Sequence, residues 1–230
     1  MSEIAVVILN YNGRDHLRNF LPSVTQFSKE ASIYVVDNHS QDDSLEIISH
    51  YPQVRVVSLD KNHGFAKGYN LGLKEIEAKY YVILNSDVEV TKDWLTPLKI
   101  FMDENPNYAV CQPKILDQQN RQKFEYAGAA GGFVDHLGYP FCRGRIFDEV
   151  ENDEGQYNQP LDILWTSGAC FMIRAEQYWK HHGFDEDFFA HMEEIDLCWR
   201  LYSHGLKAIC LPASKVYHVG GGTLLYGSAK

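Results

Sequence analysis

Short apolar segments alternate with longer stretches of helical spacing over the first half of the chain. The short segments predict strands at 4–9, 33–36, 54–59, 80–84 and 108–112. The stretches between them place apolar residues three or four positions apart, which predicts helices at about 15–27, 42–51, 66–78 and 91–105. Strands that alternate with helices form right-handed β-α-β units, and nearly continuous apolar strands are typical of a sheet covered on both faces. The pattern therefore predicts an α/β fold with a mostly parallel sheet.

The alternation stops near residue 117. The segment from about 117 to 160 is rich in glycine, aromatic and charged residues, which predicts a long, partly mobile loop with a hairpin. Beyond it, the pattern predicts a strand at 169–173, helices at 175–181 and 193–204, and a short strand at 208–211. No element is recognisable from Val219 onwards.

Composition narrows the classes of partner. Lysine and arginine number 21 and aspartate and glutamate 31, so the net charge is −10, which repels nucleic acid and other polyanions. The five cysteines lie far apart in apolar runs without a C-x-x-C pair, which predicts free, buried thiols in a reducing compartment. The sequence lacks both a signal-peptide pattern and an apolar stretch near the roughly 18–20 residues that span a bilayer. We therefore expect a cytoplasmic protein without a transmembrane segment.

Polar residues follow the first four predicted strands where each strand ends. They are Asn10-Tyr11-Asn12-Gly13, Asp37-Asn38-His39-Ser40, Asp60 with the segment 62–70, and Asn85-Ser86-Asp87. Each alone is typical of a turn, and Ser86 or Asp87 is also suited to cap a following helix. Together they would lie at the carboxyl edge of one sheet, where open α/β folds bind ligands. Asp87 is placed there to hold a divalent cation and, through it, a phosphate.

Two common nucleotide sites are disfavoured. The first turn has a single glycine where a dinucleotide fold has G-x-G-x-x-G, and no G-x-x-x-x-G-K-[ST] of a P-loop is present. Glycines at 64, 68 and 72 would share one helix face, which suits either close packing on the sheet or close approach to a ligand.

A second group of acids lies in the segment 184–200. On a helix that begins near Glu193, Asp196 shares a face with Glu193 and Arg200, which favours a structural Asp196–Arg200 pair. Glu193 and Glu194 have no local partner, so they are better candidates for a general base. The pattern H-x-E at residue 191 is also found in zinc deaminases, but their P-C-x-x-C is missing. His218 precedes three glycines and suits either a structural role or a ligand beside a loop that folds over a site.

Eight of these segments, in this order, resemble one known family. They are V-V-I-L-N-Y-N-G, V-V-D-N-H-S-Q-D, N-H-G-F-A-K-G-Y-N, L-N-S-D-V-E-V, S-G-A-C-F-M-I-R, F-D-E-D-F-F, E-E-I-D-L-C-W-R and the late His218. The chain is similar, from residue 4 to about 223, to the inverting, metal-dependent glycosyltransferases of family 2. These have the GT-A nucleotide-diphospho-sugar transferase fold, a Rossmann-like α/β/α sandwich. Within the family the chain looks most like bacterial rhamnosyltransferase-like members that build surface polysaccharides.

The resemblance implies a role for each matched position. The nucleotide-sugar would contact Asn10, Tyr11, Asp37, Asn38, Ser40, Lys67, Asn70, Asn85, Ser86 and Asp87. Asp87 and His218 would hold Mg²⁺ or Mn²⁺, and Ser167 and Gly168 would border the acceptor. Glu194 stands at the usual position of the catalytic base but replaces an aspartate, so Glu193 and Asp196 remain alternatives. Asn85 replaces the first aspartate of the D-x-D motif, which removes one charge from the site.

The resemblance also implies the reaction and its partners. One domain, 1–230, would combine a nucleotide-sugar-binding half (1–116) with an acceptor-binding half (117–230). It would transfer a sugar from a UDP-, dTDP- or GDP-linked donor to a saccharide or lipid-linked saccharide, at the inner face of the membrane. Two alternatives stay open: a sugar-nucleotidyltransferase of the same fold, and a non-catalytic nucleotide-sugar-binding domain. A glycoside hydrolase also uses two carboxylates, but it needs no nucleotide pocket.

Overall fold

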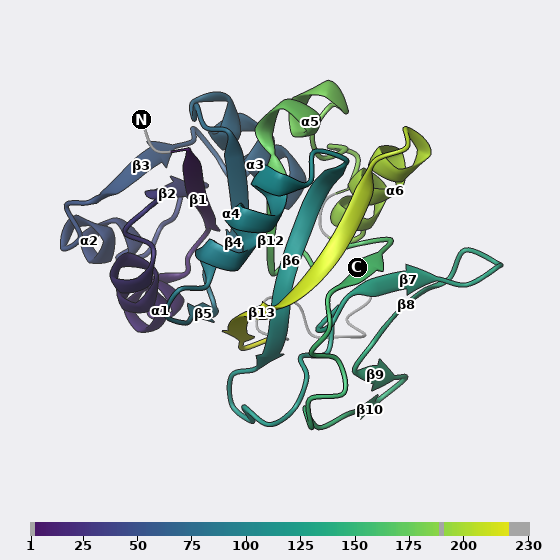
Figure 1. Ribbon diagram of the computed structural model, residues 1–230. Coiled ribbons are helices and arrows are strands. Elements are labelled where there is room, and N and C mark those ends of the chain that lie inside the picture. Colours follow the sequence, from purple (N-terminus) through teal and green to yellow (C-terminus); the bar gives the residue numbers. More distant parts are fainter. Residues whose placement is uncertain (1–2, 189–190, 221–230) are drawn as a thin grey trace.

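The computed structural model describes residues 3–188 and 191–220, and Figure 1 shows a central sheet with helices on both faces. Its strands are β1 (Ile4–Asn10), β2 (Ser32–Asp37), β3 (Val54–Ser58), β4 (Tyr80–Asn85), β5 (Val88–Val90), β6 (Tyr108–Asp117), β11 (Leu161–Ile163), β12 (Cys170–Arg174) and β13 (Lys207–His218). They lie in the order β11-β13-β6-β12-β4-β1-β2-β3, and β5 pairs with β13. Six of these nine strands run the same way, whereas β5, β11 and β12 run opposite.

Two helical layers cover this sheet. One face carries α1 (Arg14–Phe27), α2 (Ser44–Ser49) and α4 (Leu95–Glu104), and the other carries α3 (Phe65–Lys74), α5 (Ala175–Lys180) and α6 (Glu193–Ser203). Alternate residues of a strand point to opposite faces. Thus Val6 of β1 packs in the core with α1, whereas its neighbour Val7 packs in the core with α3. The apolar strands predicted this arrangement, because both faces must be covered.

The glycines of α3 serve close packing. A β carbon on Gly72 would overlap the side chain of Val36 in β2, and one on Gly68 would lie 3.0 Å from Cδ1 of Leu9 in β1. Gly64 precedes the helix with φ of 76°, a conformation that favours glycine. Of the two roles considered for these glycines, the structure shows helix–sheet contact for Gly68 and Gly72.

The strands β6 and β13 extend well past the predicted segments 108–112 and 208–211. Polar residues interrupt the apolar pattern in both, and the pairing of the two strands is irregular between Leu211 and Lys215. The buried polar side chains in β6 have internal partners. Gln112 accepts a hydrogen bond from the backbone of Ser167, and Lys114 binds Asp153 at 2.9 Å. Residue 189, the last of the matched F-D-E-D-F-F segment, and residues 221–223, the end of the matched region, lie outside the described residues.

The triplet Asn85-Ser86-Asp87 does not cap a helix, so that prediction is wrong. Ser86 and Asp87 form the turn between β4 and β5, and the next helix, α4, begins only at Leu95 with Trp94 at its N-cap. The short strand β5 was not predicted, because three residues carry too little periodicity. Its pairing with β13 fixes the turn against the end of the last strand.

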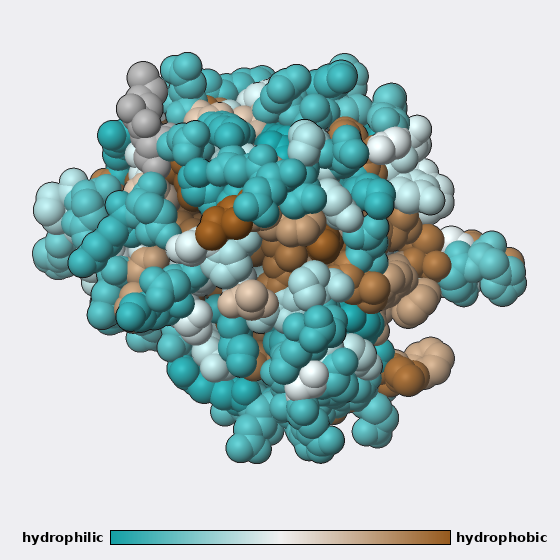
Figure 2. All heavy atoms as spheres, viewed as in Figure 1, coloured by the Kyte–Doolittle hydropathy of each residue, from teal (hydrophilic) through white to brown (hydrophobic). Residues whose placement is uncertain are grey.

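The segment 118–160 is folded rather than a simple loop. It contains two hairpins, β7 (Gly132–Val134) with β8 (Pro140–Cys142) and β9 (Arg145–Ile146) with β10 (Glu149–Val150). Figure 2 shows apolar side chains on the side where these hairpins project, and the exposed ones include Leu137 and Phe147. The buried Lys114 holds the segment to the sheet through Asp153 and Asn158. The prediction of a partly mobile loop underestimated this order.

The cysteines and the helix lengths bear on two predictions made from composition. All five cysteines are buried and free, as predicted. Within residues 3–188 and 191–220, none of the helices has both the length and the apolar character required to cross a membrane.

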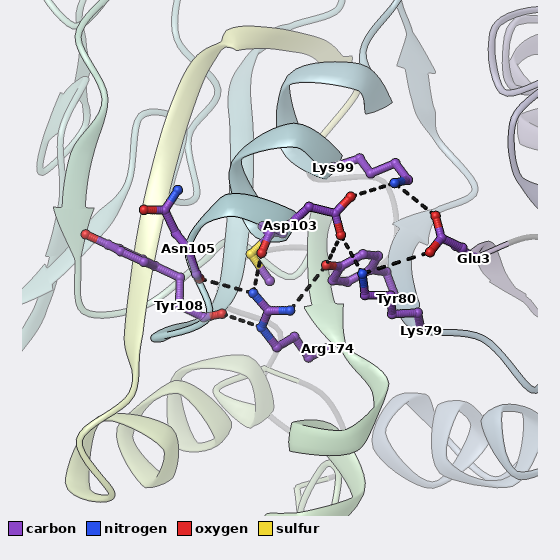
Figure 3. Close-up of polar contacts among 9 residues, drawn as sticks. Glu3, Lys79, Tyr80, Lys99, Asp103, Asn105, Tyr108 and Arg174 are labelled. Carbon is purple, nitrogen blue, oxygen red and sulfur yellow. Dashed lines mark hydrogen bonds and ion pairs between the residues drawn. The ribbon is translucent and has the colours of Figure 1, made fainter.

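A polar network closes the amino edge of the sheet, opposite the polar strand ends. Figure 3 shows the guanidinium of Arg174, at the end of β12, among the last residues of α4 and the start of β6. It donates to the carbonyl oxygens of Met102, Asn105 and Tyr108. Nearby, hydrogen bonds from Lys79, Lys99 and the hydroxyl of Tyr80 lower the pKa of Asp103. The arginine that ends the S-G-A-C-F-M-I-R segment is therefore structural.

We expect Arg174→Ala to destabilise the protein by about 2–4 kcal/mol. The substitution leaves the carbonyl groups of Met102, Asn105 and Tyr108, between α4 and the start of β6, without their charged donor. Leaving such groups unsatisfied accounts for most of the cost. Urea unfolding monitored by circular dichroism measures the change. Arg18→Ala is the matched control, because Asp15, on the exposed face of α1, is the one acid paired with Arg18 in the described part of the chain. This variant should cost less than about 0.5 kcal/mol. Equal stability of the two variants would contradict a structural role for Arg174.

Candidate active site

The carboxyl ends of β1, β2 and β4 bring three polar segments together. In the sheet, Asn10 at the end of β1 is in register with Asp37 at the end of β2, and Leu9 is in register with Asn85 at the end of β4. The predicted strand ends therefore meet at one edge. The first turn also approaches the third segment, because a β carbon on Gly13 would lie 3.5 Å from the hydroxyl of Ser86.

Three of the predicted nucleotide-binding residues form one network. The amide nitrogen of Asn10 donates to the hydroxyl of Ser40 at 3.0 Å and lies 3.5 Å from Oδ1 of Asp37, and the backbone N–H of Ser40 donates to Oδ2 of Asp37 at 3.2 Å. Asn10 is fully buried, and its Oδ1 has no hydrogen-bond partner among the described residues. Tyr11, next to it, is half exposed. An unsatisfied buried acceptor in a polar wall suits a site that a ligand completes.

A surface hollow of about 400 Å³ adjoins this network. Its lining comes from the turn after β1, the start of α1 and the loop after β2, and consists of Asn12, Gly13, Arg14, Asp15, His16, Gln41 and Asp42. Arg14 is held there by Asp15 and Asp43. The hollow has the polar walls expected of a site for part of a nucleotide.

Three other predicted nucleotide-binding residues make contacts within the protein instead. The amide of Asn38 binds Asn62, His63 and Gly64, and so fixes the turn before α3. The amide of Asn70 binds the backbone of Phe184 and the hydroxyl of Tyr178. Lys67 pairs with Glu186 at 3.0 Å. These side chains hold the loop before α3 and the segment 184–186. A contact of Asn38, Lys67 or Asn70 with the nucleotide stays a prediction.

Asp87 and His218 lie in direct contact although 131 positions separate them in the chain. The register of β5 with β13 pairs Val88 with His218, and the N–H of Val219 donates to the carbonyl of Asp87. As a result, Nε2 of His218 lies 3.1 Å from Oδ1 of Asp87, and both side chains are buried. On the other side of the ring, Nδ1 lies 3.3 Å from Oε1 of Glu125.

The electrostatics of this group follow from its two carboxylates. Burial alone would lower the pKa of His218, but the hydrogen bonds and charges of Asp87 and Glu125 outweigh it and raise the pKa to about 10. For Asp87, burial would raise the pKa, but His218 outweighs burial and the pKa is lowered. Without a cation, the imidazolium therefore compensates the buried charge of Asp87.

The donor set fits a divalent cation that is shared with phosphate. A carboxylate and an imidazole are present, whereas the described part of the chain has no group of three or more His, Cys, Asp and Glu that could hold a metal alone. Glu89, two residues after Asp87, is bound to Arg121 and does not join them. Mg²⁺ typically takes one or two protein ligands and completes its shell with phosphate oxygens and water, and Mn²⁺ also accepts imidazole.

The acids of α6 fall into two kinds. Asp196 is paired with Arg200 at 2.6 Å, as predicted, and Arg200 also donates to the carbonyls of His181 and Gly183. Asp196 is therefore committed to a structural contact. Glu193 is buried, and within the described part of the chain its Oε2 has no hydrogen-bond partner. Glu194 lies beside the predicted acceptor segment, because a β carbon on Gly168 would be 3.5 Å from its Cδ.

The two glutamates at the start of α6 are poised to take up a proton. Burial raises the pKa of Glu193, and burial together with the charge of Glu193 raises the pKa of Glu194. A carboxylate with a raised pKa is a stronger base in its ionised form. The backbone just before them is strained, because His191 and Met192 both have positive φ. Such strain is concentrated at functional sites in proteins.

Sequence reasoning missed Glu125 and His16. Glu125 lies in the segment predicted to be a loop, where nothing in the local pattern links it to a histidine 93 positions later. His16 is on α1 and lines the surface hollow beside the site. Only the positions of the folded strands bring either residue to the site.

The curated relatives of this chain include several glycosyltransferases. The low-salt glycan biosynthesis hexosyltransferase Agl10 of Haloferax volcanii is 26% identical over 207 residues, which are 87% of this chain and 62% of the relative. The N-acetylglucosaminyl-diphospho-decaprenol L-rhamnosyltransferase of Mycobacterium tuberculosis is 24% identical over 94% of this chain and 75% of its own length. The dTDP-rhamnosyl transferase RfbF of Shigella flexneri is 25% identical over 96% of this chain and 70% of its own.

Solved structures show the same fold. GalNAc-T7 with UDP, GalNAc and Mn²⁺ superimposes with a TM-score of 0.73 at 18% identity over 95% of this chain, which spans 44% of that protein. Staphylococcus aureus TarS 1-349 with UDP-GlcNAc superimposes with a TM-score of 0.70 at 19% identity, covering 99% of this chain and 61% of that one. The chain therefore has the GT-A fold, as its sequence resemblance implied.

A family model gives the assignment directly. The model described as glycosyl transferase family 2 matches residues 5–182, which include the three polar strand ends and the acceptor segment. The three curated relatives described above are named as hexosyl- and rhamnosyltransferases. The chain belongs to glycosyltransferase family 2, and it resembles the bacterial rhamnosyltransferases of that family.

Proposed function

We propose that this glycosyltransferase uses a divalent cation, Mg²⁺ or Mn²⁺, to transfer a sugar from a nucleotide-diphospho-sugar to an acceptor hydroxyl with inversion. One observation carries the proposal. The Asp87–His218 pair lies at the same sheet edge as the network of Asn10, Asp37 and Ser40. A phosphate bound at the pair would thus have a polar site for its nucleoside close by.

On the donor side, the nucleoside would meet Asn10, Tyr11, Asp37 and Ser40. The unsatisfied Oδ1 of Asn10 and the carboxylate of Asp37 are acceptors, so they suit N–H and O–H groups of a base or ribose. Asn85 and Ser86 would lie beside the diphosphate as neutral polar groups. A UDP-, dTDP- or GDP-linked donor is proposed, which agrees with the dTDP-rhamnosyl relative and with the UDP in the GalNAc-T7 structure.

Asp87 and His218 would hold the cation. When bound, the cation would neutralise negative charge on the departing diphosphate. To take part, His218 must give up the proton on Nε2, since only a neutral imidazole nitrogen can bind a metal. Asn85 supplies no charge where a full D-x-D has a second aspartate. The site therefore depends on Asp87 more than a two-aspartate site would.

On the acceptor side, we assign Glu194 as the base. It borders the segment of Ser167 and Gly168, and its raised pKa suits removal of a proton from an attacking hydroxyl. Attack on the face opposite the departing diphosphate would invert the anomeric carbon in one displacement. Glu193 remains the alternative base because none of the described residues forms a hydrogen bond with its Oε2, whereas Asp196 is bound to Arg200.

For the acceptor we propose a saccharide, free or lipid-linked, in the synthesis of a surface polysaccharide. The name of the Mycobacterium tuberculosis relative, which includes a sugar-diphospho-decaprenol, supports a lipid-linked acceptor. Such an acceptor would require peripheral contact with the inner face of the membrane.

A thermal-shift panel of UDP-, GDP- and dTDP-sugars tests the donor site. We expect one nucleotide class to raise the melting temperature by roughly 5–10 °C at about 100 times its Kd, because this binding adds about 2.7 kcal/mol. The shift should be larger with Mn²⁺ than without it. Asp37→Ala should lose most of the shift, whereas Asp103→Ala, at the opposite edge of the sheet, should keep it. No shift with any donor, or an equal shift in both variants, would contradict the proposed pocket.

A further inference from the structure

Glu125, in the segment between β6 and β7, lies against the ring of His218, on the side opposite Asp87. We propose that Glu125 is a positioning residue, which holds His218 so that Nε2 faces Asp87 and the cation. The inference rests on the proposed metal-dependent function and deepens it. It gives the segment 118–160, otherwise remote from the chemistry, a part in the metal site.

Glu125 is itself rigidly held. Only 3% of its surface is exposed, and its backbone N–H donates to the carbonyl of Ile115 in β6. Of its two carboxylate oxygens, Oε2 accepts the N–H of Ala127 at 2.7 Å, and Oε1 faces Nδ1 of His218 at 3.3 Å. Among the described residues, His218 is the one cationic group paired with it. Among the described residues, the imidazole of His218 is therefore the charged group that the carboxylate of Glu125 faces.

A carboxylate at Nδ1 of His218 affects how Nε2 can bind a metal. A histidine that binds a metal through one ring nitrogen usually donates the N–H of the other to a carboxylate or carbonyl, which fixes the tautomer and the orientation of the ring. Nδ1 of His218 lies 3.3 Å from Oε1 of Glu125 but does not meet the geometry of a hydrogen bond in this structure. With a cation bound, Glu125 would accept the Nδ1 proton, and the lone pair of Nε2 would then lie on the side of Asp87. Because Glu125 contacts the ring nitrogen remote from Asp87, it would orient His218 rather than bind the cation itself.

The chain after His218 leaves room for this contact. A β carbon on Gly220 would lie 3.2 Å from Oε1 of Glu125, and Gly220 has φ of 64°. A larger residue at this position would both strain the backbone and press on the carboxylate. Glu125 therefore lies between Gly220, just after β13, and the rest of the segment 118–160.

The test is direct Mn²⁺ binding, by calorimetry in the presence of UDP, to wild type, Glu125→Ala and Glu125→Gln. We expect Glu125→Ala to weaken Mn²⁺ binding about 10- to 100-fold, the range seen for such outer carboxylates. Glu125→Gln, which keeps one acceptor oxygen, should weaken it less. Glu151→Ala is the matched control: Glu151 lies in the same segment but binds Tyr157 and Gln156, so Mn²⁺ binding should stay as in wild type.

The outcomes separate the inference from the function on which it rests. If wild type binds no Mn²⁺, the proposed metal dependence fails, and the role of Glu125 fails with it. If wild type binds Mn²⁺ and folded Glu125→Ala binds it equally well, only the positioning role is overturned. Should Glu125→Ala not fold, Glu125→Gln decides: unchanged affinity and unchanged ¹⁵N shifts of the His218 ring overturn the proposal, whereas a loss of affinity with a changed ring tautomer supports it.

Discussion

Replacing Asp87 by alanine is expected to abolish metal-dependent sugar transfer, with kcat/KM falling by at least about 10³-fold, or roughly 4 kcal/mol of transition-state stabilisation. The reason is that Asp87 is the sole carboxylate of the pair that would hold the cation, because Asn85 is neutral and Glu89 is bound to Arg121. Initial rates measured over a range of Mn²⁺ concentrations, together with Mn²⁺ affinity, give the change.

Glu89→Ala is the matched control for this variant. Glu89 lies two residues further on, in β5, and its carboxylate pairs with Arg121 at 2.5 Å. We expect the control to transfer sugar at nearly the wild-type rate. Circular dichroism should show that both variants are folded. Unchanged turnover in folded Asp87→Ala would remove Asp87 from the mechanism.

Replacing Glu194 by glutamine is expected to lower kcat by about 10²–10⁴-fold, as for loss of a general base, while nucleotide binding is kept. The same variant should be more stable than wild type at neutral and alkaline pH. Burial and the charge of Glu193 raise the pKa of Glu194 in the folded protein. For an acid with a raised folded pKa, the stabilising contribution is complete below the unfolded pKa, about 4.3, and is lost as pH rises through the folded value.

Melting temperatures measured from pH 4 to pH 8.5 test whether Glu194→Gln gains stability over wild type as pH rises. Wild type and Glu194→Gln should melt alike near pH 4, and the variant should melt increasingly higher as pH rises. Glu193→Gln is the comparison for the base assignment, because its pKa is also raised. If Glu193→Gln loses kcat and Glu194→Gln retains it, the base is Glu193. A stability difference that does not change with pH would contradict the assigned ionisation of Glu194.

Much of the donor half could be predicted from sequence, because its elements are local and periodic. The strands that end at Asn10, Asp37 and Asn85 are short apolar runs, and parallel β-α-β units require their carboxyl ends to meet. The Asp196–Arg200 pair could also be predicted, since residues four apart on a helix are neighbours. These predictions depended on spacing within one element or on a rule for consecutive elements.

The rest depended on contacts between distant segments. The strand β5 is too short to show a period, and its pairing with β13 places Asp87 against His218. The segment 118–160 lacked apolar periodicity because much of its order comes from buried polar contacts, such as Lys114 with Asp153. Glu125 could not be predicted as a site residue either, because its partner, His218, lies in a distant segment. Nor could the sequence show that Asn38 and Asn70 have partners inside the protein, since those partners lie in other segments.

The central claim is that a cation held by Asp87 and His218 is required for sugar transfer. The most direct measurement is release of nucleoside diphosphate from the donor class identified in the thermal-shift panel, followed with Mn²⁺, with a chelator, and with Mn²⁺ restored. We predict release with Mn²⁺, its loss with the chelator and its recovery on restoring Mn²⁺, in wild type but not in Asp87→Ala. Release that continues at the same rate without a divalent cation, or that persists in Asp87→Ala, would contradict the account.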